Sequence, residues 1–68
     1  MIIDIPKIGQ IWQRGNLQRE VISVDKRSDR ENDYNITWRR PGGVGKTFVI
    51  WLPYWKQWCN KAALVLSA

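Results

Sequence analysis

One stretch of the chain has the residue types of a phosphate-binding loop. Residues 42–47 read GGVGKT. In a P-loop, the backbone N–H groups of a glycine-rich turn and the N-terminus of the following helix converge on phosphate, and the lysine reaches the terminal phosphates. The first question is whether this chain hydrolyses a nucleotide through these residues.

The residues around this stretch argue against a nucleotide site. The full pattern requires a glycine five positions before Gly45, where this chain has Arg40. The variant found in partitioning ATPases has a lysine before the paired glycines, where Pro41 stands. The segment that follows, FVIWL, alternates as a strand does, so no helix N-terminus is expected there. We instead interpret 41–45 as a hairpin tip, because Pro41 presets φ and the glycines permit positive φ.

Other residues give little support for catalysis or metal binding. The chain has no histidine and a single cysteine, so the commonest general base and an ordinary zinc ligand set are missing. Cys59 lies beside Trp58 and is expected to be a buried, inert thiol. The acids between positions 20 and 33 alternate with basic residues, which is typical of a solvated loop. We therefore expect no enzyme activity, no cofactor and no metal.

The positive charge is concentrated in the second half of the chain. The formal net charge of the 68 residues is +5, yet residues 1–33 contain six basic and six acidic side chains. Residues 34–68 contain no acid, and their basic side chains are Arg39, Arg40, Lys46, Lys56 and Lys61. A one-sided basic distribution is typical of a surface that binds a polyanion, although it also serves solubility.

The chain shows no targeting signal. MIIDIPKIG has no basic segment followed by an apolar run, so it does not resemble a signal peptide. No stretch approaches the roughly 20 apolar residues that span a bilayer. We expect a cytoplasmic protein without membrane contact.

The residue pattern predicts one domain, 1–68, made mostly of strands. Alternation and β-branched residues predict strands over 9–14, 17–25, 34–40, 46–52 and 63–67. Gly15-Asn16 predicts a turn, and the polar segment 26–33 predicts a solvated loop. Pro53 and the spacing of Trp55, Trp58 and Cys59 predict a helical turn over 53–62.

This order of elements resembles the small SH3-like barrels, in the broad sense that includes the Tudor and KOW modules. The opening strand follows a proline-containing lead-in, IPKIGQIW, and a helical turn precedes the closing strand in YWKQWCNKAALVL. The resemblance implies an all-β fold, a small SH3-like antiparallel barrel of four to five strands with a short helical turn before the last strand. The whole chain also resembles small uncharacterised proteins of phages and prophages of enteric bacteria.

The tryptophans divide into core and surface candidates. Trp38, Trp55 and Trp58 share faces with other apolar residues and are expected in the core. Trp51 lies opposite the face of Phe48, Ile50 and Leu52, so it is expected at the surface unless the sharply bent sheet buries both faces in part or the helical turn covers it. Trp12 lies opposite Ile11, and the same two possibilities, exposed or partly buried, apply to it.

The leading expectation is a non-enzymatic module that binds DNA or RNA. Exposed tryptophan among basic residues is typical of a platform on which bases stack. The predicted contacts are Arg39, Arg40, Lys46, Lys56 and Lys61 for phosphate and Trp51 for stacking. The alternative is a protein-interaction module, for instance a phage accessory factor that binds a host protein through a tryptophan patch. A third interpretation is a homo-oligomer with a shared pore for an anionic ligand.

Overall fold

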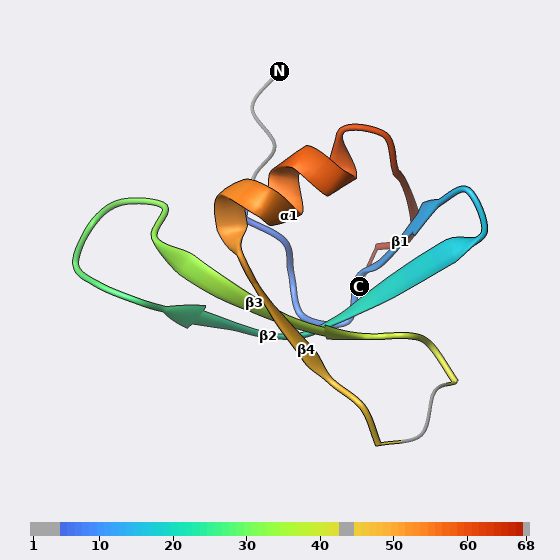
Figure 1. Ribbon diagram of the computed structural model, residues 1–68, viewed down its shortest axis with the longest axis horizontal. Coiled ribbons are helices and arrows are strands. Elements are labelled where there is room, and N and C mark those ends of the chain that lie inside the picture. The colour runs from blue at the N-terminus through green and yellow to red at the C-terminus, as the bar shows by residue number, and fades with distance from the viewer. Residues whose placement is uncertain (1–4, 43–44, 68) are drawn as a thin grey trace.

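The computed structural model describes residues 5–42 and 45–67. Within them, five strands and one helix follow one another along the chain (Figure 1). They are β1 (Ile11–Arg14), β2 (Leu17–Lys26), β3 (Tyr34–Arg39), β4 (Phe48–Trp51), α1 (Leu52–Cys59) and β5 (Ala63–Leu66). The predicted all-β class, with one short helix before the last strand, is confirmed.

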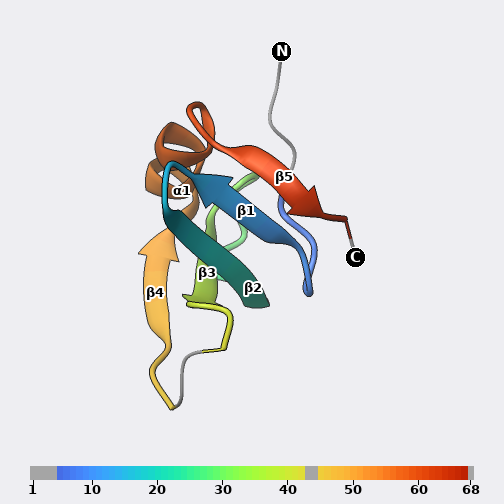
Figure 2. The same ribbon diagram turned by 90° about the vertical axis from the view of Figure 1, so that its right-hand side faces the viewer.

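The strands form one antiparallel sheet in the order β4-β3-β2-β1-β5. The long strand β2 joins its two halves: residues 17–20 pair with β1, and residues 20–26 pair with β3. A register shift between Val21 and Ser23 lies where these two pairings meet, and such irregularities bend a strand. Figure 2 shows the outer part of the sheet, with β5 beside β1 and β2, turned away from β3 and β4. The result is one strongly bent antiparallel sheet of five strands, with a single short helix before the last of them.

Glycines with positive φ lie in the β1–β2 and β3–β4 hairpins. Gly15 has φ +61, and with Asn16 it forms a two-residue turn between Arg14 and Leu17, which pair with each other. A glycine with positive φ at the first turn position is the signature of a type II′ hairpin. In the β3–β4 hairpin, Gly42 has φ +75 and Gly45 has φ +80, which confirms the conformational role predicted for them. The prediction for Gly43 lies outside the described residues.

The core lies between the concave side of the sheet and α1, which lies across it (Figure 1). Val21 and Ile36 contribute from the sheet, and Leu52, Trp55, Trp58 and Cys59 contribute from the helix. Trp55 and Ile36 are fully buried. The helical spacing of the apolar residues therefore predicted the buried face of α1. Burial of one indole removes a large apolar area from water, which contributes appreciably to the stability of so small a domain.

The β3–β4 pairing divides the side chains into two faces. The Ile36–Ile50 and Trp38–Phe48 pairs lie on the face that contains the core, with Phe48 at its margin and 42% exposed. The Thr37–Val49 and Asn35–Trp51 pairs lie on the outer face. Trp51 is 40% exposed, so part of its ring faces solvent. Trp38 is only half-buried and stacks on Phe48 at 4.7 Å between ring centroids, so it lies at the rim of the core.

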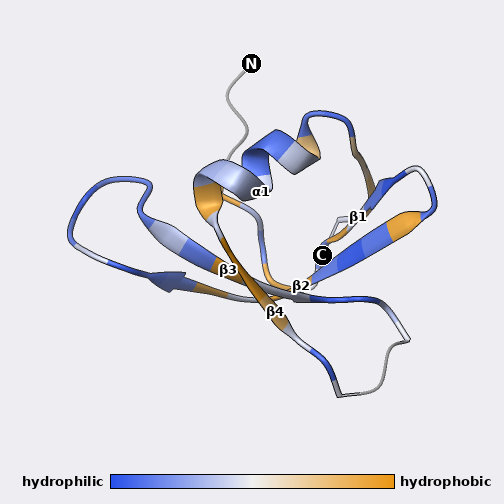
Figure 3. Cartoon of the chain, viewed as in Figure 1, coloured by the Kyte–Doolittle hydropathy of each residue, from blue (hydrophilic) through white to orange (hydrophobic). Residues whose placement is uncertain are grey.

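Element boundaries differ by a few residues from those predicted. The helix begins at Leu52, with Pro53 in its first turn, and ends at Cys59. Asn60 closes it by donating its backbone N–H to the carbonyl of Lys56 at 3.0 Å. Strand β4 is correspondingly shorter, because Lys46 precedes the paired residues and Leu52 belongs to the helix. Figure 3 shows hydrophobic residues along β4 and at the start of α1, and hydrophilic residues over most of the loop between β2 and β3.

Candidate functional site

The basic residues predicted to contact nucleic acid lie in two separate places. Arg39 and Arg40 lie at the end of β3, and Lys46 lies on the other arm of the same hairpin. Lys56 lies on α1, and Lys61 follows that helix. Figure 1 shows α1 at the top of the molecule and the β3–β4 hairpin tip at the bottom. The structure thus unites three of the five basic residues in one hairpin.

Arg39 is partly neutralised by an acid on the neighbouring strand. Its Nε donates to Oε1 of Glu20 at 2.9 Å, directly across the β2–β3 pairing. Both side chains remain partly exposed. An exposed pair of this kind contributes little to stability, but it reduces the charge that Arg39 offers to a ligand.

A groove separates the β1–β2 turn from the base of the β3–β4 hairpin, and we call it the hairpin groove. It has a volume of about 370 Å³. Its lining residues are Gln13, Asn16, Leu17, Gln18, Arg40 and Pro41. The lining therefore contains a guanidinium and amide groups, and none of these six residues is acidic.

Hydrogen bonds hold the amides of this groove in place. Gln18 Nε2 donates to Gln13 Oε1 at 3.0 Å, and Gln13 Nε2 donates to the carbonyl of Gly15 at 2.9 Å. These oriented amides line the same groove as Arg40. Guanidinium and amide N–H groups are the donors that protein surfaces use for phosphate oxygens.

Arg19 lies next to the groove and was not among the predicted site residues. Its guanidinium carbon lies 4.0 Å from the centroid of the Trp38 ring and 4.3 Å from that of Trp58. Strand alternation offered a signal for it, because Arg19 and the buried Val21 are two residues apart and share a face. A charged residue at an inward position of a strand is unusual.

The surroundings of Arg19 disfavour its positive charge. Burial lowers the pKa of its guanidinium, and the nearby Arg14 lowers it further, while Cys59 acts in the opposite direction. Since an arginine stays protonated in proteins, the consequence is a charged group in an environment that lacks a compensating anion. In the described part of the chain, Nη1 of Arg19 is buried and has no hydrogen-bond partner.

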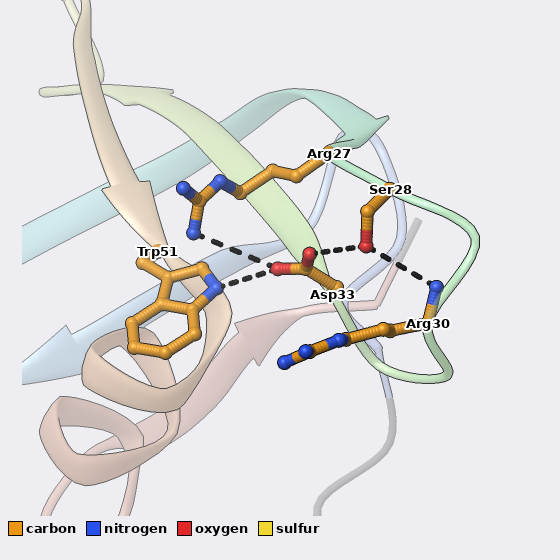
Figure 4. A network of polar contacts seen from close by, with 5 residues as sticks. All are labelled: Arg27, Ser28, Arg30, Asp33 and Trp51. Atoms are coloured by element: carbon orange, nitrogen blue, oxygen red, sulfur yellow. Dashed lines mark hydrogen bonds and ion pairs between the residues drawn. The ribbon is translucent and has the colours of Figure 1, made fainter.

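Trp51 belongs to a different site, formed with the loop between β2 and β3 (Figure 4). Its Nε1 donates to Oδ1 of Asp33 at 2.9 Å, and the Ser28 hydroxyl donates to Oδ2 at 2.6 Å. Arg27 Nη1 lies 3.6 Å from the same carboxylate, and the Arg30 backbone N–H donates to Ser28 Oγ at 3.2 Å. This network orders the loop between β2 and β3, whose residues 26–32 are exposed as the sequence predicted.

Asp33 is the centre of that network. The hydrogen bonds from Ser28 and Trp51 lower the pKa of its carboxyl group, and Arg27 and Arg30 act in the same direction. A cavity of about 530 Å³ lies against the loop, and Trp51 and Pro53 form part of its wall. The sequence analysis missed this pairing because Asp33 and Trp51 are 18 residues apart and only the β3 register brings them together.

Trp51 and the hairpin groove lie near opposite ends of β3. Trp51 pairs with Asn35, four residues before Arg39, which corresponds to roughly 13 Å along a strand. One face of its ring lies toward Arg27, at 5.3 Å, and Tyr54 packs edge-on at 5.8 Å. Trp51 is therefore exposed but held in a fixed orientation.

Cys59 offers no reactive thiol. It is buried at the contact of α1 with the sheet, and burial raises its pKa to about 12, against an opposing effect of Arg19. Among the described residues, no group of three or more Cys, Asp or Glu side chains lies close enough to hold a metal ion. No helix within residues 5–42 and 45–67 is long and apolar enough to cross a bilayer.

Comparison with known proteins adds no relative to this picture. No protein family, curated protein or solved structure matches the chain.

Proposed function

We propose that this protein is a non-enzymatic binding module that contacts the phosphates of nucleic acid through the hairpin groove. The observation that carries the proposal is the groove itself, in which Arg40 and oriented amides form a polar wall without an acidic residue. Lys46 on the opposite arm of the hairpin adds a further exposed cation. Phosphate contacts of this kind supply most of the affinity for nucleic acid, independent of its base sequence.

The outer face of β3 and β4 offers a path from the groove to Trp51. Going back along β3 from the groove, this face carries Arg39, Thr37 and then Asn35, and Asn35 pairs with Trp51. A single strand that follows this face would bring its phosphates to the hairpin and a base to the free face of the indole, where stacking is worth about 1–3 kcal/mol. Lys56 and Lys61, near the helix, would contribute only to the long-range attraction of a polyanion.

A binding assay with charge-matched variants tests the proposal. Fluorescence anisotropy of a labelled single strand and of its duplex is measured at low ionic strength. Arg40→Gln is expected to weaken binding by about tenfold, the usual effect of losing one charged hydrogen bond. Lys26→Gln removes the same charge at the far end of β2 and is expected to leave the affinity within about twofold. Absence of binding at low salt, or equal losses in both variants, would show that the groove is not the interface.

A protein partner is the second candidate, and the exposed aromatic surface around Trp51 favours it. Trp51, Tyr54 and Val49 are 40%, 57% and 64% exposed. Tryptophan and tyrosine at the centre of a small patch are typical of interaction hot spots. Under this proposal the protein is a phage accessory factor that binds a host protein. A complex recovered from host lysate should then survive nuclease treatment and disappear with Trp51→Ala, but not with Arg40→Gln.

A further inference from the structure

Arg19 combines a partly buried, charged side chain with a position beside a small cavity. Its guanidinium is held between the Trp38 and Trp58 rings, at 4.0 and 4.3 Å from their centroids. Two aromatic faces fix the plane of the group and satisfy none of its N–H donors. Nη1 is buried and has no partner within the described chain. A buried charged donor without an acceptor is costly. Nη1 itself is closed to water, so an acceptor from outside the chain would reach the guanidinium through the cavity that Arg19 lines.

A small cavity of about 40 Å³ connects Arg19 with the hairpin groove. Arg19 and Trp38 line it on one side, and Leu17, Gln18 and Arg40 line both this cavity and the groove. The two spaces therefore share a wall. A volume of this size holds roughly one water molecule, or one oxygen atom of a larger anion.

The charges around this cavity all have the same sign. Trp12 pairs with Arg19 and shares its face of the sheet. Arg14 is two residues from Trp12 on β1, so it lies on that face too. The acid adjacent in sequence, Glu20, has its side chain on the other face and binds Arg39. Neither cavity has an acidic residue in its lining. Like charges close together repel, and an anion between them removes that repulsion.

We propose that Arg19 and Arg40 form an anion site that takes one phosphate group, with Arg19 at its floor and Arg40 at its rim. One phosphate oxygen enters the small cavity and accepts from Arg19, while the others remain in the groove and accept from Arg40 and the amide of Gln18. The planar guanidinium fork suits the oxygens of phosphate. This inference rests on the proposed function, because it names the group of the nucleic acid that the groove recognises.

The site is tested by the side-chain Nε–Hε NMR signal of Arg19, which reports directly on that guanidinium. The protein is titrated with inorganic phosphate, with a short single-stranded oligonucleotide, and with chloride at matched ionic strength. Phosphate and oligonucleotide are expected to shift the Arg19 signal in a saturable manner, and chloride is not. In Arg40→Gln the affinity for either is expected to fall by about tenfold or more, whereas Lys26→Gln should behave as the wild type. Arg19 itself is left intact, because its replacement could unfold the core.

The outcomes separate this inference from the proposed function. If the oligonucleotide binds but neither ligand moves the Arg19 signal, the anion site is wrong and the nucleic-acid function stands. If inorganic phosphate moves the signal and no oligonucleotide binds, the anion site stands for free phosphate and the proposed function is wrong. A shift with the oligonucleotide alone supports both and identifies the phosphodiester as the group bound. No shift and no binding overturn both.

Discussion

Burial determines the chemistry of the single cysteine. The Cys59 thiol is enclosed where α1 meets the sheet, and its pKa is raised from 9.0 to about 12. A raised pKa of this kind leaves about a thousandth of the usual thiolate population at mildly alkaline pH. Since the thiolate is the reactive form, the folded protein should not use this residue as a nucleophile.

The reaction of Cys59 with a disulfide reagent tests this description. In the native protein we expect labelling slower than that of the unfolded chain by about a thousandfold. Labelling in denaturant serves as the control for the reactivity of the chain itself. Rapid stoichiometric labelling under native conditions would mean that the thiol is exposed and that the core is packed differently.

The second residue-scale feature is the link between Asp33 and Trp51. The folded-state pKa of Asp33 lies below its usual value because of bonds from Ser28 and Trp51. A carboxyl group with a lowered folded-state pKa stabilises the fold at pH above its unfolded value. That contribution is lost as the pH falls through the folded-state pKa.

Replacing the indole tests this link. In Trp51→Phe the Asp33 carboxyl loses one donor, so its pKa should rise toward the ordinary value near 4. The free energy of unfolding should then differ less between neutral and acidic pH. The carboxyl carbon shift of Asp33, followed by NMR against pH, measures this directly. Trp12→Phe is the matched control, since Trp12 Nε1 bonds Gln10 instead of an acid. An unchanged Asp33 titration in Trp51→Phe would contradict the network.

At the scale of elements, the two faces of the β3–β4 hairpin have different energetic roles. Ile36 is fully buried, while Val49, on the outer face, is 64% exposed. Ile36→Ala should reduce the free energy of unfolding by about 2–5 kcal/mol through a lost core contact and a cavity. Val49→Ala should cost about 0.5 kcal/mol or less. Denaturant unfolding compares them, and equal losses would mean that the assignment of faces is wrong.

The strands and turns could be predicted because their signals are local. Alternation in YNITW and FVIW gives the two faces of β3 and β4, and the glycines of the hairpins mark where the chain reverses. The ends of α1 were predicted less well, since Pro53 permits a helix start one residue earlier and Asn60 ends it. Helix and strand boundaries depend on capping contacts that a residue pattern does not contain.

The candidate site was harder to predict because it depends on contacts between distant strands. The sequence predicts the hairpin and its basic residues. It does not predict the groove, because the groove forms only where the β1–β2 turn lies beside Arg40. The position of Trp51 follows from alternation, but its partner Asp33 comes from a loop on the other side of β3. Arg19 was overlooked because its contacts with Trp38 and Trp58 form only when α1 packs on the sheet.

At the scale of the whole molecule, the net charge of +5 is not spread evenly over its functional surfaces. Arg39 and Arg27 pair with acids, and the cavity beside Trp51 is lined by Glu31 and Asp33 as well as by Arg27 and Arg30. Arg40, Arg19 and Arg14 have no acidic partner among the described residues, and two of these three line the groove and its side cavity. A polyanion would therefore be attracted to this region in preference to the Trp51 surface.

The dependence of oligonucleotide affinity on salt tests the central claim most directly. Binding that uses groove phosphate contacts releases counterions, so the logarithm of the association constant should fall linearly with the logarithm of the salt concentration. Removal of one such contact by Arg40→Gln should make the slope shallower by about 0.7 for a single strand, while Lys26→Gln leaves it unchanged. A flat salt response of the wild type, or a slope that Arg40→Gln does not alter, would contradict the account.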